Sequence, residues 1–445
     1  EIPCGFKSRL QHKSKDAMKI IKKLLLVLFF ISNSFSSDLE VIKTQYDSGS
    51  FDSAYNQILD YISKGDDKNA SSYVLASDIA LSLDSLGRAN EFLLKAIDLD
   101  KTNDEFRKKW TKLDSLRISL KEANRRLESG LINEAIISYE NIIDINPKFA
   151  MSYFRLGRIY YNDNNLEDAV YFFRKAIDLN PFNSTYNNYI TNIAKKLAKE
   201  GNDIFRRKDY ENAAQKYIQS TKVDPTYTEA YYRAGKSFYM LGDYDTAKEK
   251  IELGLENNSQ HVQSLKLIGD IESKEGNNSE AVVWYQRAIK TNSNYHIAHY
   301  ALGKSYFKLE KNEEALNSLK NAVMVDPTYA KAYELIGIIE KQSGNLESSI
   351  SNFKLAIEHD KKAYIANFRL ASVFNEMKNY SEAKIAAKAC IDTKRKYAAA
   401  WYELGVAEKN LGNMAAAKIA FKEASKDRKW KESAQYEIKM LNKEP

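Results

Sequence analysis

Residues 150–183, AMSYFRLGRIYYNDNNLEDAVYFFRKAIDLNPFN, carry the pattern that decides the fold. When this stretch is numbered from 1 to 34, large apolar residues stand at positions 4, 7, 11 and 24. The first three follow the i, i+3, i+7 spacing of a helix with one buried face. Gly157 and Ala169, at positions 8 and 20, are small, and Pro181 would end a second helix. The stretch therefore predicts two helices that cross closely at their small residues.

The small residue of position 20 recurs along most of the chain, at intervals of 35, 46, 34 and 44 residues and then six times 34 residues. It is found at Ala54, Ala89, Ala135, Ala169, Ala213, Ala247, Ala281, Ala315, Ser349, Ala383 and Ala417. A fixed period of this length indicates an array of structural repeats, each of which buries its apolar face against its neighbours. The repeats that follow are 35–68, 70–103, 116–149, 150–183, 194–227, 228–261, 262–295, 296–329, 330–363, 364–397 and 398–431.

These positions and residue types closely resemble the tetratricopeptide repeat (TPR) over about nine-tenths of the chain. The resemblance implies an all-α fold: a right-handed superhelical solenoid of stacked antiparallel helix hairpins, with about eleven TPR units and a C-terminal capping helix at 432–445. Insertions at 104–115 and 184–193 add about three helical turns each, so we expect a lengthened first helix at each place. We expect the array to divide there into residues 37–103, 104–183 and 184–431.

Residues 18–36 have the pattern of a secretion signal peptide. Lys19, Lys22 and Lys23 precede the apolar run LLLVLFFI, and SNSFSS supplies small residues for cleavage. The run is too short to span a bilayer stably. A buried core helix is the alternative, which the adjoining lysines disfavour. We therefore expect an exported chain, periplasmic or secreted, and interpret residues 1–17 as a non-native upstream extension.

The basic residues are concentrated in that N-terminal segment. The chain carries 67 Lys+Arg and 60 Asp+Glu, a formal net charge of +7. Seven of the basic and two of the acidic residues lie in residues 1–36, so +2 remains for the rest. This balance does not give the broad basic surface typical of nucleic-acid binding, and we predict no nucleic-acid partner. Cys390, the only cysteine after residue 36, stands at a small buried position and is predicted to pack rather than react.

The sequence contains no motif of a phosphate-binding loop, a dinucleotide site, a zinc protease or a serine hydrolase. His296 and His299, three residues apart, are an alternative metal pair, but position 4 is a packing site and no third ligand is near in sequence. We therefore predict a non-enzymatic protein with no metal and no cofactor.

The resemblance also implies where a partner binds. In TPR folds, positions 2, 5, 6, 9, 12 and 13 of each first helix line a concave groove. Here they carry aromatic and cationic side chains, which suit an extended acidic protein segment or an anionic glycan. A merely solvated face is the alternative, since Glu229 and Asp270 stand in the same stretch. The predicted partner-binding residues are Phe154, Arg155, Arg158, Tyr161, Asn202, Arg206, Tyr232, Arg233, Lys236, Tyr239, Tyr300, Lys304, Arg369 and Tyr402.

The two-carboxylate clamp of chaperone-binding TPR proteins is not expected. Of its five residues only Asn202 is present, and Ala198, Arg233, Gln263 and Leu267 occupy the other positions. The sequence thus predicts a non-enzymatic TPR scaffold or adaptor that binds protein segments in its groove in the cell envelope. The alternative is a TPR component of an envelope polysaccharide export or secretion assembly that binds anionic glycan. No stable membrane span is expected after signal cleavage.

Overall fold

The structure is a computed structural model that describes residues 38–64 and 69–442 of the chain. The predicted signal peptide and upstream extension lie outside the described residues. Within those two ranges there are 23 helices and no strand, which confirms the all-α prediction. The described residues form two compact units, unit 1 up to Lys196 and unit 2 from Leu197.

The helices follow one another with short turns between them. Unit 1 contains α2 (Asp38–Asp47), α3 (Phe51–Ser63), α4 (Ala70–Ser82), α5 (Leu86–Leu99), α6 (Asp104–Glu128), α7 (Ile132–Ile145), α8 (Ala150–Asn162), α9 (Leu166–Leu179) and the start of α10 (Ser184–Arg206). Unit 2 contains the rest of α10 and α11 (Tyr210–Val223), α12 (Thr228–Leu241), α13 (Tyr244–Asn257), α14 (Val262–Glu275), α15 (Asn278–Thr291), α16 (His296–Lys308), α17 (Asn312–Val325), α18 (Ala330–Gln342), α19 (Leu346–His359), α20 (Tyr364–Glu376), α21 (Tyr380–Thr393), α22 (Ala398–Asn410), α23 (Met414–Ala424) and α24 (Lys431–Leu441).

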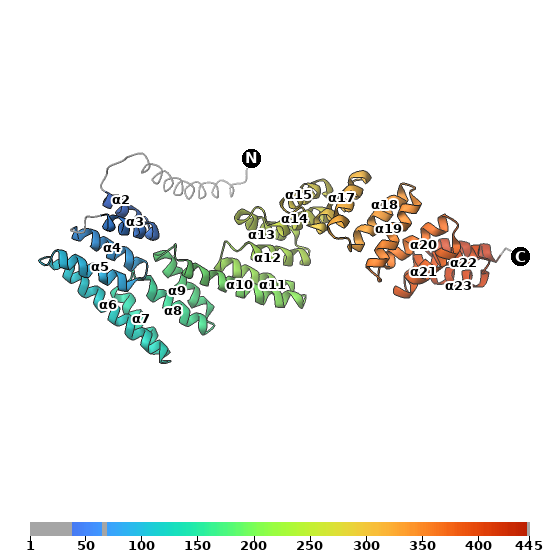
Figure 1. Ribbon diagram of the computed structural model, residues 1–445. Helices are drawn as coiled ribbons and strands as arrows, with labels where there is room; N and C mark the ends of the chain where they lie inside the picture. Colours follow the sequence, from blue (N-terminus) through green and yellow to red (C-terminus); the bar gives the residue numbers. More distant parts are fainter. Residues whose placement is uncertain (1–37, 65–68, 443–445) are drawn as a thin grey trace, which may run out of the picture. The chain divides into compact units, whose positions relative to one another are not determined.

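Successive helices pack as hairpins, and within each unit neighbouring hairpins pack against one another (Figure 1). The tightest pairs, such as α8 with α9 and α16 with α17, are the two helices of one predicted repeat. Gly242 ends α12 in the left-handed conformation, at φ +84°, which a glycine adopts without strain. The stacked hairpins predicted from the 34-residue period are therefore confirmed within each unit.

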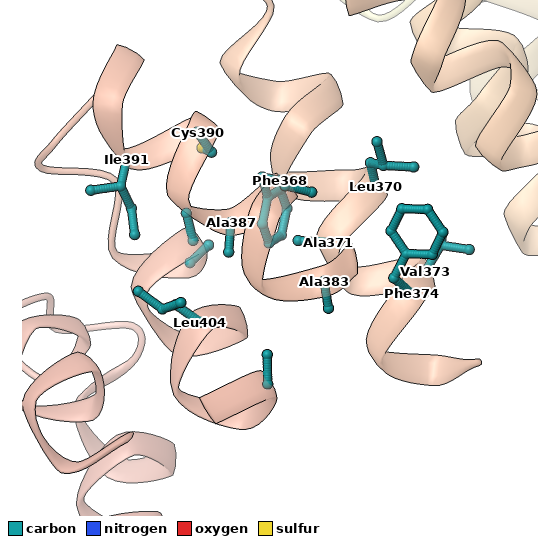
Figure 2. Close-up of a cluster of buried hydrophobic side chains, with 14 of the residues drawn as sticks. Phe368, Leu370, Ala371, Val373, Phe374, Ala383, Ala387, Cys390, Ile391 and Leu404 are labelled. Carbon is teal, nitrogen blue, oxygen red and sulfur yellow. The ribbon is translucent and has the colours of Figure 1, made fainter. Parts of the chain in front are cut away.

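In the repeats that carry glycine at position 8, a large side chain of the second helix lies against that glycine. A Cβ added to Gly157 would meet Cδ1 of Phe173 at 2.7 Å, closer than carbon atoms approach each other. In the α20–α21 hairpin the same two positions hold Ala371 and Ala387, both fully buried (Figure 2). In this hairpin, therefore, the residues at both positions are small.

Both insertions lie in long helices, as their lengths predicted. The first begins α6, which has 25 residues, and the second begins α10, which has 23. The last helix, α24, packs its buried Ala434 with Phe421 of α23. The right-handed superhelix and the division of the array at the two insertions stay predictions.

Candidate functional site

The fourteen predicted groove residues differ in how much of each side chain is exposed to a partner. Phe154 is buried, with 6% of its surface exposed, and packs against Tyr186 with ring centroids 4.6 Å apart. Arg206 and Lys304 are exposed, and the other eleven are half-buried. Phe154 therefore acts as a core residue, and we leave it out of the candidate contact surface.

In unit 1 the predicted residues stack on aromatic rings of their own unit. The guanidinium carbon of Arg158 lies 6.0 Å from the ring centroid of Phe154. The Nζ atom of Lys196 lies 5.7 Å from the ring centroid of Tyr161. The Nε atom of Arg155 is buried and has no hydrogen-bond partner among the described residues. The cationic and aromatic side chains predicted for α8 are thus gathered in one place.

In the first hairpin after α10, part of the predicted charge is already neutralised. Nε of Arg233 lies 2.7 Å from a carboxylate oxygen of Glu229, whose other oxygen is 3.2 Å from His261. Burial acts to raise the pKa of Glu229, but His261 and Arg233 outweigh it and the net pKa is lowered. Arg233 is therefore less available to an acidic partner than its position suggests.

Lys236 keeps its charge free for a partner but stands in a partly apolar setting. Its Nζ atom lies 5.7 Å from the ring centroid of Phe205 and 6.0 Å from that of Tyr232. Burial lowers the pKa of its ammonium group, and the nearby charges of Arg233 and Lys266 lower it further. Burial also raises the pKa of Tyr232 to about 12.

Asn202 and Arg206 are held by neighbours within unit 2. Arg206 lies 3.0 Å from Asp203 in an exposed ion pair, which contributes little to stability. Asn202, at position 9, accepts a hydrogen bond from the tyrosine at position 24 of its own hairpin. The same link recurs in three hairpins, Tyr139 to Asn124 (2.7 Å), Tyr217 to Asn202 (2.8 Å) and Tyr285 to Asp270 (2.9 Å).

Three predicted residues, Tyr239, Tyr300 and Lys304, meet in one hollow of about 390 Å³ in unit 2, which we call the lysine hollow. It is formed by α12, α14 and α16 with Tyr285 of α15 and the start of α18. Five lysines line it: Lys266, Lys274, Lys304, Lys308 and Lys331. Its other lining residues are Tyr239, Asp270, Ser273, Tyr285, Ile297, Tyr300, Ala301 and Tyr329.

The one carboxylate of the lysine hollow is already satisfied. Asp270 accepts from Nζ of Lys266 at 2.5 Å and from the hydroxyl of Tyr285 at 2.9 Å. By contrast, no carboxylate of the described residues lies within 4.0 Å of the ammonium groups of Lys274, Lys304, Lys308 or Lys331. The hollow therefore presents positive charge that the fold itself does not neutralise.

These lysines are close enough to influence one another. Partial burial lowers the pKa of Lys308, and the charges of Lys304 and Lys274 lower it further. Nζ of Lys308 donates to the backbone carbonyl oxygen and to the hydroxyl oxygen of Ser273, both at 3.2 Å. An anion in the hollow would relieve this repulsion, so the arrangement suits an anionic ligand.

Sequence reasoning missed four of the five lysines. Lys266, Lys274, Lys308 and Lys331 stand at positions 5, 13, 13 and 2 of their repeats, all of them groove positions. Reading these positions across consecutive repeats, rather than selecting aromatic-rich ones, would have found the set.

The remaining predicted residues lie near the C-terminal end of unit 2. The guanidinium carbon of Arg369 lies 5.4 Å from the ring centroid of Phe368, and its buried Nε has no hydrogen-bond partner among the described residues. The ring of Tyr402 lies 4.9 Å from that of Trp430 and 5.5 Å from that of Phe421. The Tyr402 ring therefore packs mainly against other side chains of unit 2.

His296, His299 and Cys390, the candidates for metal binding or reactivity, each contact other residues of the fold. His299 Nε2 lies 2.9 Å from the backbone oxygen of Ser293, and His296 Nε2 lies 3.5 Å from Asp326. Cys390 is fully buried, and burial raises the pKa of its thiol to about 12, which confirms its packing role (Figure 2). Across residues 38–64 and 69–442 no group of three or more His, Cys, Asp or Glu is placed to hold a metal ion. In the same ranges, no helix combines the length and the apolar character that crossing a bilayer requires.

Two curated relatives match this chain at low identity. A TPR repeat-containing protein of Methanocaldococcus jannaschii is 24% identical over 289 residues, 63% of this chain and 46% of that protein. The antiviral innate immune response effector IFIT1 of Macaca fascicularis is 24% identical over 172 residues, 39% of this chain and 33% of that protein. The chain thus spans less than half the length of either relative.

Two of the solved structures that match this chain are described as TPR proteins. The C-terminal part of a TPR repeat-containing protein from Cytophaga hutchinsonii is 17% identical, with a TM-score of 0.43, and covers 53% of this chain and 98% of that one. A tetratricopeptide repeat protein from Parabacteroides merdae is 17% identical, with a TM-score of 0.41. The match covers 56% of this chain and 98% of that one.

Family models match the repeats themselves. A model described as "TPR repeat" matches residues 201–242, 269–310 and 303–339. Models described as "Tetratricopeptide repeat" match residues 150–183 and 398–426. The matches fall on the helix hairpins described above, and the chain belongs to the tetratricopeptide-repeat family.

Proposed function

We propose that this protein is a non-enzymatic scaffold that binds an extended acidic segment of a partner protein in the lysine hollow and along the adjoining helices of unit 2. The observation that carries this proposal is the group of four lysines with no ion-pairing carboxylate among the described residues. TPR arrays serve as protein-interaction scaffolds, which supports a protein partner. The fold alone does not identify that partner.

The expected binding is a sum of modest contacts. Lysines attract carboxylates and speed association, while the helices hold them in place before the ligand arrives. Lys236, stacked between Phe205 and Tyr232, would extend the positive surface toward α10 and α12. The affinity is therefore expected to depend on charge and on salt.

A capture experiment tests the proposal. We would compare proteins retained by the wild-type chain with those retained by Lys274→Glu/Lys304→Glu. The matched control is Lys311→Glu/Lys320→Glu. It changes two exposed lysines that lie in the same repeat as Lys304 and do not line the hollow. Loss of the same partners in the hollow variant alone supports the proposal. An identical partner set in all three proteins contradicts it.

We also propose that the protein acts in the cell envelope. The support is the signal-like pattern of residues 18–36, which lies outside the described residues. N-terminal sequencing of protein purified from the producing cells should find Ser37 as the first residue. Protein that retains residues 18–36 would contradict export by this signal.

An anionic glycan is the second candidate ligand, within a polysaccharide export or secretion assembly. The tyrosine rings of the lysine hollow favour it, because sugar rings pack well on aromatic faces. A glycan array with the purified chain distinguishes the two. Strong binding of anionic glycans together with no binding of acidic peptides would replace the protein-scaffold proposal.

A further inference from the structure

We infer that the lysine hollow selects an acidic, proline-rich segment in the polyproline II conformation, with one acidic residue in every three. This inference rests on the proposed function and adds the conformation and the charge spacing of the ligand. It follows from three features of the hollow: the interval between its lysines, its uncompensated charge and its tyrosine lining.

The interval comes from the stacking of the repeats. Lys274 and Lys308 occupy position 13 of α14 and α16, two first helices that contact each other. Packed helices lie about 8–10 Å apart, so neighbouring repeats present ammonium groups at roughly that interval. A bound chain that repeats its acidic side chains at the same interval can meet each lysine in turn.

Among regular extended conformations, polyproline II has the matching repeat. It advances about 3.1 Å per residue with three residues per turn, so every third side chain returns to one face after about 9.3 Å. A β-strand returns to one face after about 6.6–6.8 Å, which is too short. An α-helix brings a side chain back to the same face after each turn of about 5.4 Å, which is also too short.

The charge of the hollow sets how many acidic residues it can accept. Lys304 and Lys331 join Lys274 and Lys308 as lysines without an ion-pairing carboxylate among the described residues. Asp270 does not compete for them, because Lys266 and Tyr285 already bind its two oxygens. These lysines would therefore neutralise acidic residues on one face of the segment.

The tyrosines account for the proline content. Tyr239, Tyr300 and Tyr329 line the hollow, and the rings of Tyr300 and Tyr329 meet edge to face with centroids 5.3 Å apart. Grooves lined by aromatic rings bind proline side chains between them, and polyproline II leaves its backbone carbonyls free to accept hydrogen bonds. Burial raises the pKa of all three hydroxyls, so they stay protonated as donors at neutral pH.

Two labelled peptides of identical composition test the inference with the full chain. One is (Glu-Pro-Pro)4, which places a glutamate at every third residue, and the other has four consecutive glutamates followed by eight prolines. Fluorescence anisotropy should show that the spaced peptide binds about tenfold more tightly or better. Lys274→Ala/Lys304→Ala should weaken its binding by about tenfold, whereas Lys311→Ala/Lys320→Ala should leave it unchanged. All four lysines are exposed, so these changes leave the packing intact.

The outcomes separate this inference from the proposed function. Equal affinity for the two peptides, lost in the hollow variant, would overturn the spacing inference and leave the acidic-segment scaffold standing. Failure of both peptides to bind at about 1 mM would overturn both. Binding of polygalacturonate in the absence of peptide binding would assign the hollow to a glycan, and would also overturn both.

Discussion

The hydroxyl of Tyr186 donates a hydrogen bond to Oδ2 of Asp84, joining two residues that are 102 positions apart. Asp84 lies in the turn between α4 and α5 at φ +61°, and Tyr186 lies in the first turn of α10. Nearby, the side-chain amide of Asn180 donates to the backbone oxygen of Ser82 at 2.9 Å. These bonds tie hairpins of unit 1 that are not neighbours in sequence. Burial raises the pKa of Asp84 to about 6, even though the Tyr186 bond opposes that change.

Replacing Asp84 with asparagine should stabilise the protein at neutral pH. The folded pKa of about 6 lies above the 3.8 of an ordinary aspartate, so the folded state binds the proton more tightly. The proton bound by Asp84 therefore stabilises the folded state below pH 4, and this stabilisation is lost as pH rises from about 4 to about 6. Asp84→Asn stays neutral, can still accept from Tyr186 and tolerates a positive φ. The increase in the free energy of unfolding that Asp84→Asn causes, relative to wild type, should be roughly 2–3 kcal/mol larger at pH 7.5 than at pH 4.

Denaturant unfolding at the two pH values measures this difference, and hydrogen exchange in residues 82–90 and 180–190 locates it. Tyr186→Phe is the matched control. It removes the donor and should cost about 1–3 kcal/mol at pH 7.5, because the carboxylate stays buried without it. An Asp84→Asn effect that is the same at pH 4 and pH 7.5 would contradict the link between this contact and pH.

The sizes of the side chains at positions 8 and 24 should have coupled effects on the free energy of unfolding. Gly337→Ala should lower the free energy of unfolding by about 1–3 kcal/mol, because the new Cβ would meet the Phe353 ring at 2.7 Å. In the α20–α21 hairpin, Ala387→Phe should lower the free energy of unfolding by a similar amount. Adding Ala371→Gly should restore much of the lost stability. A double-mutant cycle by denaturant unfolding measures the coupling, with about 1–3 kcal/mol expected. Additive effects of Ala387→Phe and Ala371→Gly would argue against this packing rule.

The helix hairpins could be predicted from sequence because their signal is local and repeated. Small residues such as Gly157 and Ala169 recur wherever two helices cross, and the spacing of large residues identifies the buried faces. The bond between Asp84 and Tyr186 could not be predicted in this way. It joins residues three repeats apart, and no periodic pattern indicates which distant turns meet.

The candidate site could be predicted only in part, since its charge balance depends on contacts between helices. Arg233 and Lys304 are both cationic residues at groove positions, but Glu229 neutralises Arg233, whereas Lys304 has no ion-pairing carboxylate among the described residues. Asp270 seemed to dilute the basic surface, yet Lys266 and Tyr285 satisfy it. These pairings depend on which rotamers reach across a hairpin, and sequence spacing does not determine that.

Asp270→Asn should strengthen the binding of acidic peptides. The change removes the one negative charge of the lysine hollow and releases Lys266, while the amide oxygen can still accept from Tyr285. We expect the dissociation constant for (Glu-Pro-Pro)4 to fall severalfold at low salt, measured by fluorescence anisotropy. Asp203→Asn, which alters an exposed ion pair outside the hollow, is the control and should change little. Weaker binding by Asp270→Asn would show that Asp270 itself contacts the ligand.

Salt should weaken this binding because the attraction is mainly electrostatic. Raising NaCl from about 50 mM to 500 mM shortens the screening length to a few ångströms, so the wild-type affinity should fall at least about tenfold. The Lys274→Ala/Lys304→Ala variant has fewer charges to screen and should show a shallower dependence. Parallel salt titrations of the two proteins make the comparison, and an affinity independent of salt would exclude the lysines as the main contacts.

Photo-crosslinking followed by mass spectrometry tests the central claim most directly, because it locates the bound segment on the full chain. A (Glu-Pro-Pro)4 peptide with a benzophenone group at its centre should crosslink to α14 near Lys274 and to α16 near Tyr300 and Lys304. Unlabelled peptide should compete for these crosslinks, and Lys274→Ala/Lys304→Ala should remove them. Crosslinks that fall instead on α13 and α17, or that persist unchanged in the variant, would contradict a binding site in the lysine hollow.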